Sequence, residues 1–305
     1  MSLTKTMLGG ALLLFATASS AAPFFPAPGP TSVDFVNREQ ICSSCILAGD
    51  TTSELNWGIA VGNNVSFGVV TEPGATIEVD TSLDPQFSSG AGAQITAMFY
   101  GLTLNQFDDP SNTLESTGGF LDVYYDEVGL PGGGTIVNIA TLLPGARVDL
   151  DTYPGITDGV LLAHLAFAAG VNPFDGNTTI TGTSAGFPSS ITGISAAEGY
   201  ANVVLGSGGL WETILDTDFF VNSPAGAGPL AFGSRDIRFR NTFSSLGSWS
   251  GECIGSDGEP IAGSACLGAA SSDPITFFIP EPGSLLLMAS VMFGMGLIGR
   301  VRRRR

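Results

Sequence analysis

The sequence is poor in basic side chains and in the residues that most enzymes use. Its 305 residues include one lysine, Lys5, and one histidine, His164, and the formal net charge is −17. A chain this acidic repels phosphate groups, so we expect no nucleic-acid partner. With so little lysine and histidine it also lacks the side chains of P-loops, Schiff-base chemistry and imidazole-rich zinc sites. We therefore expect no enzyme activity, no metal and no cofactor, although the composition does not exclude a site built from carboxylates.

The charges that are present are strongly segregated. Hydrophobic residues make up 44% of the chain and charged residues 13%, which suits a folded core in one large or two modest domains. Between residues 22 and 280 there are five arginines, no lysine and 27 carboxylates, a balance of −22. Five further basic residues are at the C-terminus: Arg300, Arg302, Arg303, Arg304 and Arg305. Basic ends and apolar runs around an acidic middle are typical of a protein that is moved across a membrane.

The N-terminus has the pattern of a secretory signal peptide. Lys5 precedes an apolar run of about a dozen residues, which is too short to cross a bilayer as a helix. Ser19 and Ala21 then place small side chains at the −3 and −1 positions of a cleavage site. We expect a signal helix over residues 1–21 that signal peptidase removes by cutting between Ala21 and Ala22. An uncleaved membrane anchor is the alternative.

The C-terminus combines a Pro-Glu-Pro sequence with an apolar run and a basic tail. Pro280, Glu281 and Pro282 precede the uncharged residues 284–299, and the arginines follow. As a helix, this run reaches about 24 Å, slightly less than the roughly 30 Å of a hydrocarbon core. Because arginine side chains can extend to the membrane surface, we expect a transmembrane helix over 284–299. The basic tail should stay in the cytoplasm and the acidic body outside.

This order of motif, apolar span and arginine tail resembles the PEP-CTERM sorting domain of Gram-negative bacteria, over residues 280–305. The resemblance implies that an exosortase, a membrane transpeptidase, processes the chain near Pro280-Glu281-Pro282. It also implies a precursor held transiently in the inner membrane and a mature protein on the cell surface or in the extracellular matrix. In this family, sorting accompanies exopolysaccharide production and biofilm or floc formation, so an adhesive or exopolysaccharide-associated role is the first hypothesis. An ordinary membrane anchor is the alternative interpretation.

The body has the alternating apolar and polar residues of half-buried β-strands, separated by Gly and Pro turn signals. We expect an all-β body, an antiparallel β-sandwich of jelly-roll type, over residues 31–276, after a Pro-rich leader at 22–30. Residues 160–169 fit a strand or a helix, and the Gly- and Ser-rich residues 251–273 are expected to form a loop or spacer. The expected strands are 76–80, 94–100, 120–125, 135–140, 146–151, 177–183, 200–205 and 237–243.

An even number of cysteines lies in the part that we expect to be exported: Cys42, Cys45, Cys253 and Cys266. In an oxidising compartment this favours disulfides. Three pairings are possible, and Cys42–Cys45 with Cys253–Cys266 closes the shortest loops. A thioredoxin-like role for the first pair lacks a βαβ context, and the second pair is spaced too widely for a zinc site.

One catalytic motif is matched and then rejected. Residues 182–186 read Gly-Thr-Ser-Ala-Gly, the pattern of the nucleophile elbow of α/β-hydrolases. That elbow needs a helix after the serine and a histidine later in the chain. Here Pro188 follows almost at once, and His164 precedes Ser184. We interpret His164 as a hydrogen-bonded histidine of the core or of a strand edge.

Paired carboxylates leave two alternative functions open. A secreted glycan hydrolase would use two convergent carboxylates, and a calcium-dependent binding module would gather several carboxylate oxygens. The simplest interpretation is a solvated acidic face that keeps an exported protein soluble. The pairs are Asp108 with Asp109, Asp122 with Asp126 and Glu127, Asp149 with Asp151, and Asp216 with Asp218.

Overall fold

The computed structural model describes residues 23–90, 92–193, 195–223 and 228–281, and antiparallel strands make up most of its regular structure. The strands are β1 (Gly29–Cys42), β2 (Glu54–Glu72), β3 (Thr76–Val79), β4 (Phe87–Ser88), β5 (Ala93–Asp108), β6 (Thr113–Glu127), β7 (Val160–Ala168), β8 (Ile180–Thr183), β9 (Ser195–Val203), β10 (Asn222–Ser223), β11 (Gly228–Pro229), β12 (Ile237–Ser245) and β13 (Cys266–Ile279). The helices are short: α1 (Ser43–Ala48), α2 (Glu212–Leu215), and the 3-10 turns η1 (Ile139–Thr141), η2 (Pro144–Ala146) and η4 (Gly247–Trp249).

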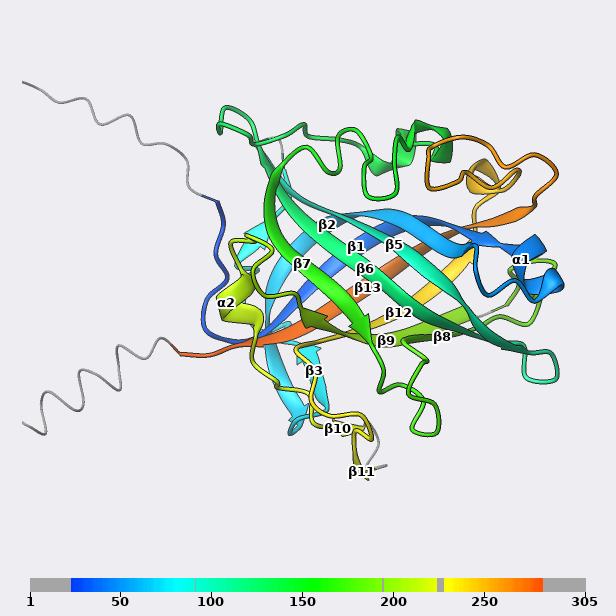
Figure 1. The fold of residues 1–305 in the computed structure, drawn as a ribbon. Helices are drawn as coiled ribbons and strands as arrows, with labels where there is room; N and C mark the ends of the chain where they lie inside the picture. The colour runs from blue at the N-terminus through cyan, green and yellow to red at the C-terminus, as the bar shows by residue number, and fades with distance from the viewer. Residues whose placement is uncertain (1–22, 91, 194, 224–227, 282–305) are drawn as a thin grey trace, which may run out of the picture.

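Eight of these strands form one closed sheet (Figure 1). Their order is β1, β13, β12, β9, β7, β6, β5 and β2, and β2 pairs again with β1. The short strand β8 continues the position of β7, because it bonds to the next stretches of β6 and β9. β3 and β4 pair with the part of β2 that extends beyond β5.

The antiparallel β class is confirmed, but the strand pairing does not separate the strands into the two facing sheets of a sandwich. β1 pairs with β13 along its whole length and with β2 from Thr31 to Ile41, so the first and last strands leave no open edge between them. Strand length is the physical reason. β1, β2, β5, β6 and β13 are 14 to 19 residues long, and long twisted strands can coil until a sheet closes.

Six of the eight expected strands overlap observed ones, in β3, β5, β6, β8, β9 and β12, and residues 160–168 form strand β7. Residues 135–140 and 146–151 were expected to be strands, and this expectation is wrong. They belong to the long β6–β7 loop, which contains η1 and η2. The apolar residues Val137, Ile139 and Leu142 pack on a cluster outside the sheet, which explains why residues 135–140 resemble a strand in sequence, whereas Val148 and Leu150 of residues 146–151 are exposed. Part of the expected loop 251–273 belongs to β13.

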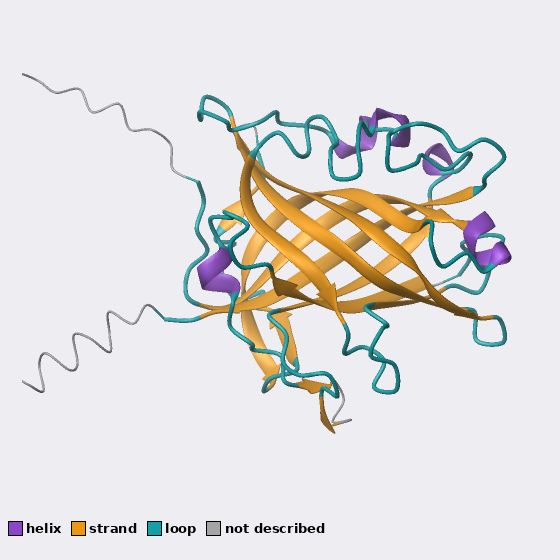
Figure 2. Ribbon diagram, viewed as in Figure 1, coloured by secondary structure: helices purple, strands orange, loops and turns teal. Residues whose placement is uncertain are grey.

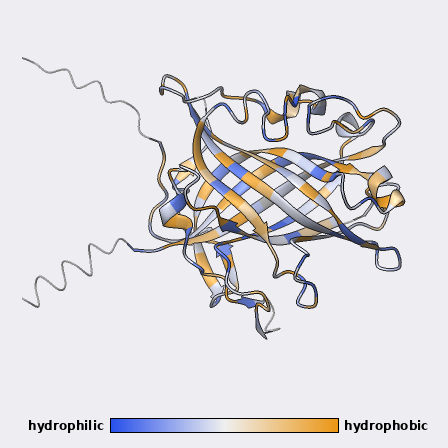
Figure 3. Ribbon diagram, viewed as in Figure 1, coloured by the Kyte–Doolittle hydropathy of each residue, from blue (hydrophilic) through white to orange (hydrophobic). Residues whose placement is uncertain are grey.

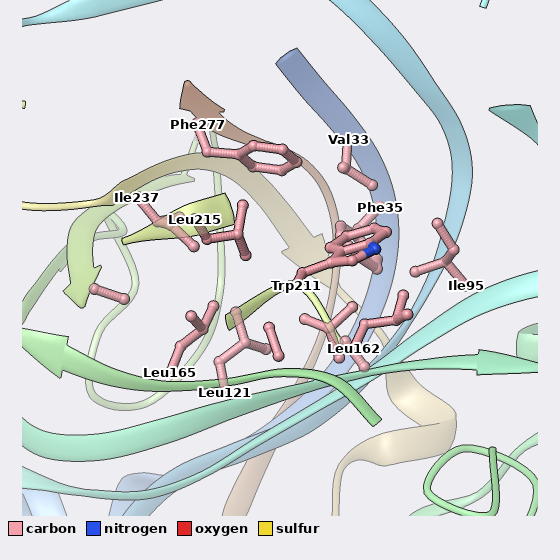
Figure 4. Packing of buried hydrophobic residues seen from close by; sticks show 14 of the residues in the cluster. Val33, Phe35, Ile95, Leu121, Leu162, Leu165, Trp211, Leu215, Ile237 and Phe277 are labelled. Atoms are coloured by element: carbon pink, nitrogen blue, oxygen red, sulfur yellow. The ribbon is translucent and has the colours of Figure 1, made fainter. Parts of the chain in front are cut away.

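The inside of the closed sheet holds the main hydrophobic core (Figure 4). Trp211, directly before α2, stands among inward side chains such as Phe35, Leu121 and Phe277. Its indole Nε1 donates a hydrogen bond to the carbonyl oxygen of Phe24 at 2.9 Å. The N-terminal segment and the α2 region therefore close the end of the sheet at which β1 begins and β13 ends.

The β6–β7 and β12–β13 loops lie over the outside of the sheet (Figure 2). A second hydrophobic cluster lies between these loops and the strands. Trp57 and Met98 on the outer face contribute to it together with Tyr153 and Trp249 from the loops. The rings of Trp57 and Trp249 lie 5.5 Å apart. The strands on this side are therefore covered on both faces, and apolar and polar residues are interleaved along them (Figure 3).

Candidate functional site

The expected sorting residues Pro280 and Glu281 are exposed and directly follow β13 (Figure 1). Gly29 at the start of β1 lies opposite Ile279 at the end of β13. The chain segments that lead to the expected signal peptide and to the expected sorting motif therefore leave the closed sheet side by side.

The other residues of the two export segments lie outside the described residues: Ala21, Ala22, Pro282, the apolar run 284–299, Arg300, Arg302, Arg303, Arg304 and Arg305. Across residues 23–281, apart from the short gaps given above, no helix combines the length and the hydropathy that a membrane span requires.

The four cysteines form the pairing with the shortest loops, Cys42–Cys45 and Cys253–Cys266. Cys42 ends β1 and lies opposite Cys266 at the start of β13, so both disulfides are at the end of the ladder opposite to Gly29 and Ile279. The sulfurs of Cys42, Cys253 and Cys266 lie within 4.8 Å of one another. Because each sulfur belongs to a disulfide, it has no thiolate to offer a metal ion.

The match to a nucleophile elbow lacks catalytic surroundings. Ser184 is 2% exposed, and its hydroxyl accepts hydrogen bonds from Ser195 Oγ at 2.9 Å and from the backbone N–H of Thr192 at 3.2 Å. The residues after Ser184 form a turn rather than a helix. His164 bonds to Asp122 instead. Ser184 is therefore a structural residue that holds the loop between β8 and β9.

Two carboxyl groups have strongly raised pKa values, and both are buried. Burial raises the pKa of Glu39 and of Asp126 to about 7. Glu39 accepts a hydrogen bond from Asn56 Nδ2 at 2.9 Å, and Asp126 accepts one from Thr96 Oγ1 at 2.9 Å. Their exposed fractions are 4% and 0%. Because the pKa values rise mainly through burial and not in an open cleft between facing carboxylates, these groups do not support the glycan hydrolase.

The paired carboxylates do not converge into a calcium-type cluster. Asp149 Oδ1 accepts a bond from the backbone N–H of Leu150, and Asp151 Oδ1 accepts one from Thr152 Oγ1. Both lie in the β6–β7 loop rather than on one face of a strand. Within the part of the chain that the structure describes, the cysteine sulfurs are the only group of three or more ligand atoms that lies within 4.8 Å.

The structure instead assembles a polar and aromatic cluster across the outer face of β5, β6 and β7. We call it the His164 cluster; it consists of Tyr100, Phe120, Asp122 and His164. Asp122 lies opposite His164 in the β6–β7 register, and His164 Nδ1 makes a short hydrogen bond to Asp122 Oδ1. Tyr100 Oη donates to Asp122 Oδ2 at 3.0 Å. The Asp122 carboxylate therefore holds both neighbouring side chains in place.

The rings of the His164 cluster form a row. Phe120 stacks on His164 with their ring centres 5.1 Å apart, and Tyr100 lies 5.8 Å from Phe120. Phe120 is 38% exposed and the His164 side chain 24% exposed, whereas Asp122 is buried. The row thus presents two accessible rings above a buried carboxylate.

Burial and acidic neighbours act together on the phenols in this region. Burial and then the charge of Asp122 raise the pKa of Tyr100 and of Tyr124, and the charge of Asp151 raises both further. Both phenols are hydrogen-bonded to Asp122, so their oxygens are left as acceptors. Exposed ring surface beside hydroxyl and carboxylate acceptors is suited to ligands rich in hydroxyl groups.

Sequence reasoning identified His164 as a hydrogen-bonded histidine, which is confirmed, but it did not find the partners. Asp122 and His164 are 42 residues apart, and they meet because β6 and β7 are neighbours in the sheet. The alternation of Phe120, Asp122 and Tyr124 in one strand was the available signal, since residues two apart share a face. No protein-family model matches the chain, and no match was found among curated proteins or among solved structures.

Proposed function

We propose that this chain is an exported protein of the cell surface or extracellular matrix, that an exosortase-type transpeptidase sorts it, and that its body associates with exopolysaccharide. The observation that supports sorting is the exposed Pro280-Glu281 step directly after the last strand. β13 stays paired with β1 as far as Ile279. A cut beyond this point would remove the tail without opening the closed sheet.

The placement of the two ends agrees with this route. Signal peptidase would cut between Ala21 and Ala22, and the exosortase would cut near Pro280-Glu281-Pro282, so both cuts would fall beyond the same end of the sheet. In the inner-membrane precursor, the expected transmembrane helix would attach the body to the membrane at this end. The two disulfides are compatible with an oxidising compartment outside the cytoplasm.

The sorting proposal is tested by deleting residues 280–282 in the producing bacterium. We expect the deletion to block C-terminal processing, so that the uncut precursor stays in the membrane fraction. Glu259→Ala, which changes an exposed carboxylate outside the motif, is the matched control and should be processed normally. Mass spectrometry of the surface fraction gives the readout. An intact arginine tail on the mature surface protein would refute sorting.

The His164 cluster supports the exopolysaccharide association. Its exposed Phe120 ring and half-buried His164 ring can pack against the apolar faces of sugar rings, while Tyr124 and Asp151 beside them can bond to hydroxyl groups. The acidic balance of the body favours a glycan that is neutral or that binds through hydroxyl groups over one that is strongly anionic.

A binding screen of the purified protein against the exopolysaccharide of its own producer, with and without calcium, tests the association. Phe120→Ala is expected to weaken binding about tenfold, because one aromatic contact in such a site contributes on the order of 1–2 kcal/mol. Phe174→Ala removes a loop phenylalanine that is 95% exposed and should leave binding unchanged. Absence of binding in both conditions, or equal losses in the two variants, would count against the proposal.

A further inference from the structure

The closed sheet does not fill its own interior. A cavity of about 90 Å³ remains inside, and every strand of the ring contributes to its wall. Four of the inward positions carry small residues: Ala60, Ala97, Gly182 and Ala197. Protein interiors are normally packed without voids of this size, and an empty cavity costs stability. An unfilled interior is therefore a feature that needs an explanation.

Most of the cavity wall is apolar and aromatic. Phe35, Phe99, Phe167 and Phe239 line it from β1, β5, β7 and β12. A glycine beside one of these rings preserves the space, because a Cβ atom on Gly58 would come within 2.6 Å of Phe99 Cζ. The wall is therefore suited to an apolar molecule, which would gain dispersion contacts that water cannot provide.

Polar atoms at the cavity lack partners of their own. The Oδ1 atoms of Asn56 and Asn241 are buried and accept no hydrogen bond from the described residues. Both side chains line the cavity, as does Glu39, which accepts a bond from Asn56 Nδ2. A buried acceptor without a donor is unfavourable, so a ligand group that donates a hydrogen bond to either oxygen would be stabilised here.

We propose that the interior cavity is a binding site for a small apolar molecule that carries a hydroxyl group, such as a short-chain alcohol. The hydroxyl donates to Asn56 Oδ1 or Asn241 Oδ1, and the alkyl chain packs against the phenylalanines. A ligand carboxylate is disfavoured by the neighbouring Glu39, and an ammonium group would lose its hydration in an apolar wall. The size sets a limit, since an engineered cavity of roughly 150 Å³ in another protein holds one benzene molecule and this cavity is smaller. The ligand therefore has fewer non-hydrogen atoms than benzene.

The test uses a matched pair of small probes, 3-fluoropropan-1-ol and 1-fluorobutane, whose binding to the purified full chain in detergent solution is followed by ¹⁹F NMR. We expect 3-fluoropropan-1-ol to bind about tenfold more tightly, the effect of one additional hydrogen bond of about 1.4 kcal/mol. Ala60→Leu, which places a larger side chain in the cavity, should abolish binding of both probes. The variant is measured in the same detergent solution as the unmodified chain, so any uptake of probe by detergent cancels in the comparison.

Asn56→Leu and Asn241→Leu, measured separately, locate the hydroxyl. We expect at least one of them to bring the two probes to equal affinity while 1-fluorobutane still binds. If Ala60→Leu does not fold, as judged by its near-ultraviolet circular dichroism, the smaller change Ala97→Val replaces it. The proposal is overturned if neither probe binds, if both bind equally well to the unmodified chain, or if the filled variant binds as well as that chain does.

Discussion

Replacing Glu39 with glutamine is expected to remove a loss of stability that the protein undergoes as the pH rises. Glu39 points from β1 into the interior of the closed sheet and is 4% exposed. Burial raises the pKa of its carboxyl group from 4.5 to about 7, although the hydrogen bond from Asn56 acts in the opposite direction. The folded protein therefore keeps this proton at pH values at which the unfolded chain has released it.

The difference between the folded and unfolded pKa of Glu39 sets the sign and the size of the pH effect on the free energy of unfolding. The contribution of Glu39 to the free energy of unfolding is fully present below pH 4.5 and declines as the pH rises to about 7. Each pH unit in this window costs about 1.4 kcal/mol, so the whole decline is about 3 kcal/mol. Glutamine has no proton to lose and retains an amide that can bond to Asn56, so the Glu39→Gln variant should lack this decline.

Chemical denaturation followed by tryptophan fluorescence at pH 5, 6, 7 and 8, with the disulfides intact, measures the effect. Between pH 5 and pH 8, the free energy of unfolding of the variant should rise by about 3 kcal/mol relative to that of the unmodified protein. Asp126, whose pKa is also raised to about 7, is present in both proteins, so its own decline cancels. Glu259→Gln, at an exposed position, is the control and should show no such gain. A difference between Glu39→Gln and the unmodified protein that stays constant across this range would refute the reasoning.

Two further predictions concern stability at fixed pH, measured by urea denaturation. Replacing both cysteines of Cys253–Cys266 with serine should cost about 3 kcal/mol and the same change at Cys42–Cys45 about 2 kcal/mol, because the first disulfide closes the longer loop; equal costs would contradict this account. Arg147→Met should cost about 3 kcal/mol or more, because the fully buried guanidinium makes two hydrogen bonds to Glu54, at 2.6 and 3.1 Å. Arg240→Met, at a side chain 56% exposed, should change stability by less than about 1 kcal/mol, and a similar loss in both arginine variants would disprove the role of burial.

Local pattern predicted much of the fold, because alternation records which residues face a core. Residues 76–80 alternate apolar and polar side chains and contain β3, and residues 120–125, rich in aromatic and β-branched side chains, form part of β6. The closure of the sheet could not be predicted in this way. An inward residue is apolar whether it faces a second sheet or the far side of the same sheet, so the two architectures share one pattern.

The loop at residues 135–151 shows a different limit. Val137 and Ile139 are apolar because they pack on the cluster outside the sheet, which needs apolar side chains as a strand would. The candidate site could not be predicted either, because it depends on pairing between strands that are far apart in the sequence. Tyr100, Asp122 and His164 come from three strands, and their contact follows from the β5–β6–β7 order, which no local pattern encodes.

The two ends of the closed sheet are stabilised by different means, and this difference is compatible with the proposed sorting. The β1–β13 ladder runs through 14 residue pairs, about 45 Å, from Gly29 and Ile279 to Cys42 and Cys266. At the first end, Trp211 fills the interior and bonds to Phe24 without a covalent link. At the other end, Cys42–Cys45 links the end of β1 to α1, and Cys253–Cys266 links the β12–β13 loop to the start of β13. Both disulfides therefore restrict fraying where the ladder would otherwise end in solvent. If the first end faces the membrane during processing, the disulfide-bonded end points away from it, into the oxidising compartment in which disulfides form.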